Sequence, residues 1–275
     1  MNGLLRRLLA ATAVAVALPA AATTASTDYT DLWYLPAESG WGVNVVQQYD
    51  IIFATFFIYG ADNSPRWYVA PDVRSVAAPS GQNLFSGQLF STVGTYFGAP
   101  WGGPTANTQV GSVAFSFTTP TTGAVSYTIN GVSVTKSIVR QTWRGNTLTG
   151  NYIGGLSANG TSCRNNVPNG PILISGELTI GHSNFFNPVF RVDFVNSNQA
   201  RGTCTFTGGY AQEGKLGRVT GGTYSCTIQG VASPPVGTFT MTQIEANTNG
   251  VTARFAGADQ NCNYDGYFGG IRDVL

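Results

Sequence analysis

The chain is poor in charge, histidine and cysteine. Only 10% of its 275 residues are charged, against about 25% in typical soluble proteins. Removal of an N-terminal leader with Arg6 and Arg7 leaves 12 basic against 13 acidic residues, a net charge of about −1. This balance argues against electrostatic binding to nucleic acid or to a membrane surface. At 43% hydrophobic and 12% aromatic, the chain can nevertheless form packed cores.

Most familiar catalytic and cofactor motifs are also missing. The sequence has no Gly-x-Ser-x-Gly element, no Cys-x-x-Cys pair and no phosphate-binding loop. Its one histidine, His182, lies between Gly181 and Ser183-Asn184, where a turn residue is favoured over a general base for a serine or cysteine. A zinc site would lack partner ligands. We therefore expect no cofactor and no metal.

One segment near the C-terminus has the alternating oxygen donors of a calcium loop. Asp259, Asn261, Asn263 and Asp265 are spaced two residues apart. The EF-hand pattern requires Gly at the sixth position and Glu at the twelfth, and neither is present. Asp and Asn also bond their own backbone in turns, so a turn pinned by Cys262 is favoured over calcium binding.

The N-terminal segment predicts export. Two arginines precede an apolar run from Leu8 to Leu18, and small residues Ala20-x-Ala22 follow. The run is shorter than the roughly 20 residues that span a bilayer. We assign 1–22 to a cleaved signal peptide of a bacterial protein that is secreted, periplasmic or held at the cell surface, with no integral membrane span.

An exported chain with four cysteines is expected to form two disulfides, and three pairings are possible. Cys204 and Cys226 flank a turn-rich segment within strand-like runs, which favours a hairpin staple. Cys163 and Cys262 would then connect the start of the C-terminal half to its end.

Short β-rich runs separated by Gly, Asn, Pro and Ser fill the chain. Asn130-Gly131 is the strongest hairpin signal, and Val113, Phe115 and Phe117 alternate toward a core. Seven strands are expected in the N-terminal half, at Trp41–Tyr49, Ile51–Tyr59, Arg66–Ala70, Leu84–Phe90, Val110–Phe117, Ala124–Ile129 and Val132–Arg140.

The C-terminal half also consists of short β-rich runs separated by turn residues, but its sequence does not closely repeat that of the N-terminal half. A Thr-Gly-x-Tyr type of element ends at Tyr152, Tyr210 and Tyr224, as suits strongly curved strands with inward rings. Eight strands are expected, at Leu148–Gly154, Ile172–Ile180, Val189–Val195, Gly202–Thr207, Gly222–Ile228, Gly237–Ile244, Val251–Phe255 and Tyr264–Arg272.

These patterns predict an all-β protein built of two tandem antiparallel up-and-down barrels or sandwiches, with one large β domain as the alternative. We expect an N-terminal β-meander over 31–145 and a disulfide-stapled domain over 146–275. The Gly/Asn/Pro-rich segment from Ser157 to Pro171 has the composition of a domain boundary.

The segment Glu38-Ser-Gly-Trp-Gly-Val-Asn44, followed by Phe53 to Tyr59 and by Pro65-x-Trp67-Tyr68, resembles a module of poorly characterised exported proteins of proteobacteria. The resemblance covers most of 31–145, and the C-terminal half is similar to segments that often follow that module. Ser64 stands where the module has Gly. The resemblance implies no catalytic residues.

The aromatic cluster in this module is the best candidate for a binding site. Stacking rings and orienting amides are typical of glycan or small-molecule sites, and Trp41, Asn44, Gln48, Trp67 and Trp101 are the candidate ligand-binding residues. For each single ring a core position is favoured, and we expect Trp41, Phe53, Phe57 and Trp67 to build the barrel core. Trp101 lies on a loop of Pro and Gly, either tucked inward or presented to a partner.

Three functions remain open. The first is a non-catalytic exported protein that binds a small ligand, a glycan or a surface partner. The second is an extracellular carboxylate-based hydrolase that uses residues such as Glu38, Glu177, Asp193 or Glu245, unless these face solvent or pair with Arg140, Arg191 or Arg254. The third is an envelope inhibitor or structural interaction protein. A pocket lined by Trp and amides would favour the ligand-binding protein. Converging carboxylates would favour the hydrolase. An exposed apolar loop around Trp101 would favour protein interaction.

Overall fold

The computed structural model describes residues 27–77, 83–103, 106–182, 186–196 and 199–273. The expected signal peptide lies outside these residues. Within the described ranges, no helix has the length and apolar character needed to cross a bilayer.

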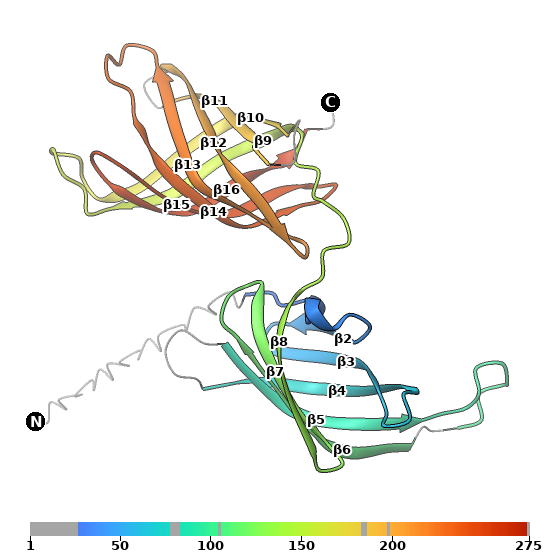
Figure 1. The fold of residues 1–275 in the computed structure, drawn as a ribbon. Coiled ribbons are helices and arrows are strands. Elements are labelled where there is room, and N and C mark those ends of the chain that lie inside the picture. Colours follow the sequence, from blue (N-terminus) through green and yellow to red (C-terminus); the bar gives the residue numbers. More distant parts are fainter. Residues whose placement is uncertain (1–26, 78–82, 104–105, 183–185, 197–198, 274–275) are drawn as a thin grey trace, which may run out of the picture.

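The N-terminal half is a closed barrel of eight antiparallel strands in sequence order. Each strand pairs with the next, and β8 pairs back with β1 to close the ring. Figure 1 labels strands β2 to β8 of this barrel. A short 3-10 helix, η1 (Pro36–Glu38), follows the first strand. The strands are β1 (Asp31–Tyr34), β2 (Gly42–Gln48), β3 (Ile51–Tyr59), β4 (Pro65–Val76), β5 (Asn83–Val93), β6 (Ala106–Phe117), β7 (Thr122–Ile129) and β8 (Val132–Arg140).

The C-terminal half forms a second closed barrel with the same strand order. Its last strand pairs with its first. The strands are β9 (Gly150–Thr161), β10 (Gly170–Gly181), β11 (Val189–Val195), β12 (Arg201–Glu213), β13 (Leu216–Ile228), β14 (Val236–Ala246), β15 (Gly250–Asp259) and β16 (Asn263–Arg272). The expectation of tandem up-and-down barrels is confirmed.

All fifteen predicted strands are present, and β1 is the one that sequence patterns missed. It has four residues, too few for a visible alternation. The predicted boundary over 157–171 is wrong. These residues end β9, form its turn and begin β10, and the two barrels are instead joined by residues 141–149. Gly and Asn mark a tight turn as readily as a linker, because both tolerate positive φ.

Both barrel interiors are filled by side chains. Val113, Phe115 and Phe117 are buried as predicted, and Phe117 stacks on Tyr29 with 3.8 Å between ring centroids. In the second barrel, Phe206 packs against four other rings within 6.1 Å. Aromatic rings therefore occupy the space that a ligand would take in a hollow barrel.

The prediction of strongly curved strands with inward tyrosine rings in the C-terminal half is confirmed. Tyr152, Tyr210 and Tyr224 are all buried. The β12–β13 ladder shifts register between Thr207 and Gly209, beside one of the three glycine elements. Bulges and glycines of this kind bend strands so that a sheet can close.

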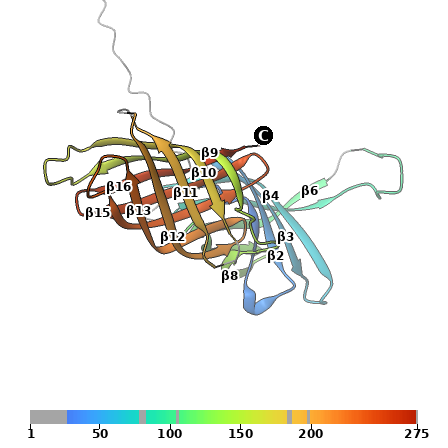
Figure 2. The same cartoon turned by 90° about the horizontal axis from the view of Figure 1, so that it is seen from above.

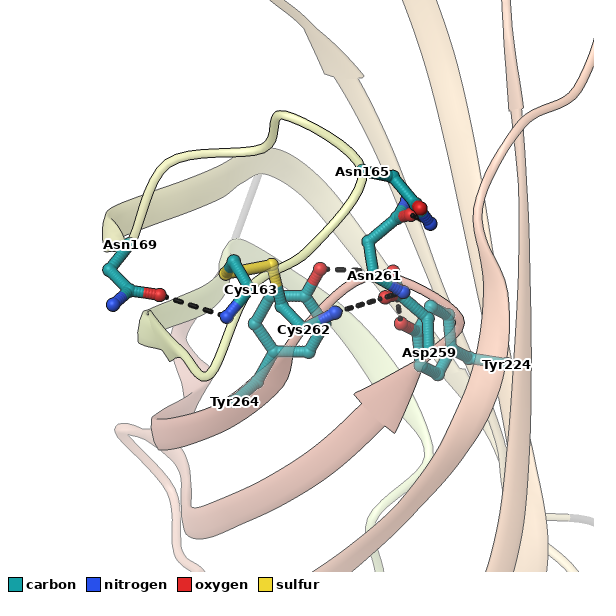
Figure 3. Close-up of a disulfide and its surroundings, with 8 residues drawn as sticks. All are labelled: Cys163, Asn165, Asn169, Tyr224, Asp259, Asn261, Cys262 and Tyr264. Atoms are coloured by element: carbon teal, nitrogen blue, oxygen red, sulfur yellow. Dashed lines mark hydrogen bonds between the residues drawn. A yellow bond between two sulfur atoms is a disulfide. The ribbon is translucent and has the colours of Figure 1, made fainter.

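Both expected disulfides form. Cys204 and Cys226 face each other across β12 and β13, with Cα atoms 4.0 Å apart. Cys163 and Cys262 connect the β9–β10 turn to the β15–β16 turn, 99 residues apart in sequence (Figure 3). Each pair holds two neighbouring segments of the second barrel.

The two barrels meet through the β12–β13 turn of the second. The Lys215 ammonium lies 2.7 Å from the Asp28 carboxylate, and the Lys215 backbone N–H donates to Asp31. The Gly214 N–H donates to the Thr142 hydroxyl at 2.8 Å. These contacts join the second barrel to the end of the first where β1 begins and β8 ends.

Candidate interaction surface

The antiparallel topology collects four connections at the end of the N-terminal barrel opposite to the second barrel. Since β1 starts at the inter-barrel end, the β1–β2 connection lies at the far end, and every second connection after it does too. The far end therefore carries residues 35–41, 60–64, 94–103 and 130–131. The aromatic motif and the Trp101 loop, which are distant in sequence, thus emerge from the same end.

The Glu-Ser-Gly-Trp-Gly motif forms a pinned turn at this end. Glu38 accepts a hydrogen bond from the Trp41 indole N–H at 3.2 Å and forms a short ion pair with Lys136. The Lys136 ammonium lies 5.3 Å from the centre of the Trp41 ring. Tyr59 donates its hydroxyl proton to the Gly40 carbonyl at 2.9 Å. The hydrogen bond and charge of Lys136 lower the pKa of Glu38, which stays ionised.

Trp41 is half-buried and packs against the barrel core together with Ile58 and Tyr68. Burial raises the pKa of the neighbouring Tyr127 hydroxyl, and the charge of Glu38 raises it further. The motif therefore closes the far end of the barrel. Within the motif, Gly40 has a φ of +112°, which is rare for residues with a side chain.

The connection between β5 and β6 carries exposed aromatic side chains, and we call residues 94–103 the arm. Phe97 is 94% exposed, Trp101 72% and Tyr96 67%. The Tyr96 and Phe97 rings lie 4.7 Å apart. The arm extends away from the barrel wall (Figure 1). Trp101 is thus presented outward, the second of the two positions expected for it.

The arm belongs to a long uncharged part of the chain. No Asp, Glu, Lys, Arg or His occurs between Arg74 and Lys136, a span that includes β5, β6 and β7. Sequence reasoning missed this signal, because the average charge of the chain conceals it. A charge-free aromatic protrusion favours contact with an apolar surface over contact with an ionic one.

The predicted ligand residues are dispersed over the barrel. Asn44 and Gln48 are exposed on β2, and Trp67 is 56% exposed on β4. Trp41 is at the far end and Trp101 is on the arm. Gln48 precedes the β2–β3 turn at the inter-barrel end, whereas Asn44 is nearer the far end. Asn44 and Trp67 lie on the same outer wall of β2 to β4, whereas Gln48, Trp41 and Trp101 lie at the ends of the barrel.

The expectation that Phe53, Phe57 and Trp67 build the core is wrong. These rings are 42%, 51% and 56% exposed, and Phe57 faces Trp67 across the β3–β4 ladder on the outer wall. The core instead takes Phe56, from the alternate positions of β3, and Trp33 from β1. The run Phe53 to Tyr59 is apolar on both strand faces, so its composition does not show which face is buried.

Two cavities, of about 890 and 690 Å³, lie on the C-terminal barrel. This barrel contains no tryptophan. The larger cavity includes Glu177 and Asp193, which face each other across β10 and β11. Asp193 forms an ion pair with Arg191 at 2.7 Å and accepts a hydrogen bond from Thr203. These two partners, Arg191 first, lower the pKa of Asp193.

A hydrolase of the two-carboxylate type needs one carboxyl with a raised pKa as general acid. Glu245 lies 3.4 Å from Lys215. Among the described carboxyls, each pKa that departs from its ordinary value is lowered, in Asp28, Glu38, Asp62 and Asp193. These groups are suited to structural ion pairs, as the Arg191 partner of Asp193 illustrates.

The remaining sequence candidates have structural contacts. The His182 ring packs edge-to-face on Tyr210 at 5.1 Å, and Ser183 lies outside the described residues. Asp259 accepts hydrogen bonds from the backbone N–H groups of Asn261 and Cys262 at 2.7 and 2.8 Å, and from the Tyr264 hydroxyl at 2.9 Å (Figure 3). This is the disulfide-pinned turn favoured by the sequence.

Comparisons with protein-family models, with curated proteins and with solved structures find no match for this chain.

Proposed function

We propose that this is an exported, non-catalytic interaction protein that binds a protein partner through the arm of its N-terminal barrel. The observation that carries the proposal is the exposure of three aromatic side chains, Tyr96, Phe97 and Trp101, on one uncharged connection. Rings of this kind dominate the energetics of protein interfaces, where Trp and Tyr are enriched among hot-spot residues.

The filled barrel interiors support an external site. Small-molecule sites are usually concave and mostly apolar, but the apolar interior here is occupied by stacked rings such as Tyr29 and Phe117. The remaining apolar surface is on the outside, and the arm carries its most exposed ring, Phe97. Exposed aromatic rings gathered on one uncharged connection are characteristic of a protein-binding surface.

The far end of the N-terminal barrel is also held rigid by side-chain contacts, which favours presentation of the arm. Glu38, Lys136 and Trp41 lock the β1–β2 turn, which lies across the same end of the barrel from the arm, and Tyr59 fixes Gly40. The arm thus emerges from a rigid barrel end on the side that the second barrel leaves free. Rigid presentation reduces the entropy lost on binding.

Site-specific photo-crosslinking in the producing cells tests the proposal. A photoreactive phenylalanine analogue replaces Phe97, and adducts are identified by mass spectrometry. We expect a discrete protein adduct, which Trp101→Ala weakens because truncation of a hot-spot ring costs about 2 kcal/mol or more in affinity.

The analogue at Tyr49 is the matched control. Tyr49 is 88% exposed but lies in the β2–β3 turn at the inter-barrel end. Equal adducts from both positions, or no protein adduct from position 97, would contradict the proposal. Release of product from glycans by the wild-type chain, lost in Glu177→Gln, would support the hydrolase instead.

A further inference from the structure

The outer wall of the C-terminal barrel contains a groove that crosses four strands. Strand register places Ser175, Gly155, Gly269 and Thr252 side by side on β10, β9, β16 and β15, and these small residues form the floor. The groove has a volume of about 690 Å³. Four strands about 4.8 Å apart give it a length of about 14 Å.

The floor is bare because no side chain fits at its centre. Gly155 has φ +151° and Gly269 has φ +158°. A Cβ atom at Gly155 would lie 2.0 Å from the Ile174 carbonyl oxygen, and one at Gly269 would lie 2.2 Å from that of Val251. Strand curvature therefore requires glycine at both positions and leaves an exposed strip of backbone.

The walls are apolar and highly exposed. Ile153 and Ile271 pair on one side of the glycines, and Tyr267 and Leu173 flank Ser157 on the other. Their side chains are between 55% and 74% exposed. Two residues along each strand separate the floor from either wall, so about 13 Å lies between the Cα rows of the two walls. This width admits an aromatic ring between the wall side chains.

Among the described residues that line the groove, the charged one is Glu245, and it lies 3.4 Å from the Lys215 ammonium. The nearby Arg254 guanidinium is not part of the lining and lies over the Tyr267 ring, 4.8 Å from its centre. The polar groups that remain at one end are the uncharged Asn247 and Asn249. The groove therefore favours an uncharged apolar occupant.

We infer that the occupant is the arm of a second copy of this chain. This inference rests on the proposed function and names its partner. The arm is narrow, uncharged and tipped by Tyr96, Phe97 and Trp101, and the groove is long, apolar and without unpaired charge among its described residues. Burial of these exposed rings between Ile271 and Leu173 would remove apolar area from water on both copies.

The arm cannot fill the groove of its own chain. It emerges from the end of the first barrel opposite to the second barrel, and both views show it extending away from that barrel (Figures 1 and 2). Electrostatic repulsion does not oppose a second copy, because the mature chain carries a net charge of about −1.

Arm and groove are different surfaces, so the contact is head-to-tail. A contact of this type does not saturate after two copies and extends into an open chain unless its rotation closes a ring. The exported chain should therefore form a concentration-dependent series of oligomers.

Sedimentation velocity of complementary variants tests the inference. The arm variant is Phe97→Ser with Trp101→Ser, and the groove variant is Leu173→Glu with Ile271→Glu. All four positions are highly exposed, so folding should be retained. We expect wild type to associate, each variant alone to be monomeric, and their equimolar mixture to form a one-to-one dimer with no larger species.

A matched control places two charges elsewhere on the same barrel, in Val195→Glu with Val236→Glu, and should associate as wild type does. Val195 and Val236 are 55% and 60% exposed and do not line the groove. Wild type that stays monomeric at all concentrations, or a mixture that does not dimerise, would overturn the inference. A crosslink from position 97 to another protein would then still support the proposed function.

Discussion

Arg272 lies across the ring of Tyr152, with 4.9 Å from its guanidinium carbon to the ring centroid. Arg140 lies in the same way across Trp33, at 5.0 Å. In both cases the arginine on the last strand of a barrel is the register partner of the aromatic residue on its first strand. Each ring also donates a hydrogen bond to the carbonyl four residues before it. Both barrels are therefore closed by the same arginine–aromatic pair between last and first strand, although their sequences are not visibly repeated.

Replacement of these arginines should affect the two barrels unequally. The Arg140 side chain is 0% exposed, and it donates hydrogen bonds to the carbonyls of Pro120 and Thr30 and to Asp31. Arg140→Met leaves these acceptors buried and should cost about 3–5 kcal/mol. Arg272→Met should cost about 1 kcal/mol, since Arg272 is partly exposed and donates to the Tyr152 hydroxyl.

Urea denaturation followed by tryptophan fluorescence measures the first effect, because all five tryptophans precede β9. Hydrogen exchange in β9 and β16 measures the second. Equal costs for the two variants would contradict the assignment of Arg140 as a buried closure residue.

Gly40→Ala should destabilise the N-terminal barrel by about 1–3 kcal/mol, because a residue with a side chain is strained at φ +112°. The new Cβ would lie 3.6 Å from the Tyr59 hydroxyl, an ordinary contact, so the effect is one of backbone conformation. Gly103→Ala is the control. Gly103 has a similar φ of +127°, but it lies on the arm outside the barrel, where a change of loop conformation can relieve the strain without loss of barrel contacts. Its denaturation midpoint should stay near that of wild type.

The two disulfides should differ in their response to mild reductant. Cys204 and Cys226 are 0% and 4% exposed within the barrel, whereas Cys163 is partly exposed in a turn. Thiol–disulfide exchange requires access of the attacking thiolate, so Cys163–Cys262 should open first. Alkylation of the freed thiols and peptide mass spectrometry give the order. Simultaneous labelling of all four cysteines would show that the barrel unfolds before either bond is reduced.

The stability of the C-terminal barrel should fall at alkaline pH. Burial and the hydrogen bond to Asp259 raise the pKa of Tyr264 from 10.0 to about 12. Below pH 10 the hydroxyl is protonated in both states. As the pH rises from 10 to about 12, the unfolded chain ionises first and stability is lost.

Tyr264→Phe should make this part of the pH dependence flatter. Denaturation midpoints at about pH 9 and about pH 11 provide the measurement, and comparison at about pH 7 isolates the lost hydrogen bond. An unchanged slope in the variant would show that Tyr264 does not protonate differently in the folded and unfolded states.

Local sequence patterns were sufficient for most strands and for the Asn130-Gly131 turn, and they favoured the Cys204–Cys226 pair among the three possible pairings. The turn residues both have positive φ, at 49° and 83°, which Asn and Gly tolerate and most residues do not. Cys204 and Cys226 lie on consecutive strands, so one hairpin brings them together. These features depend on neighbours in the chain or on a single turn.

Local sequence patterns did not show which face of each strand is exposed to water. Phe53, Phe57 and Trp67 lie on the outer wall because β3 pairs with β2 and β4 in the register that buries Ile52, Ala54 and Phe56. Their residue types alone would allow either face. The short β1 could not be predicted from local sequence, because its strand conformation depends on pairing with β8 at the closure of the ring.

The sequence by itself determined the all-β class and the inward tyrosines of the second barrel, because alternation and turn chemistry act over short distances. It favoured two barrels and the observed cysteine pairs, but closure of each sheet decided both, since Cys163 and Cys262 are 99 residues apart. Only the tertiary structure decided the outward presentation of the arm, the common end that it shares with the aromatic motif and the groove over Gly155 and Gly269. Those features arise from closure of each sheet on itself, which sets the strand register and brings together residues more than a hundred positions apart.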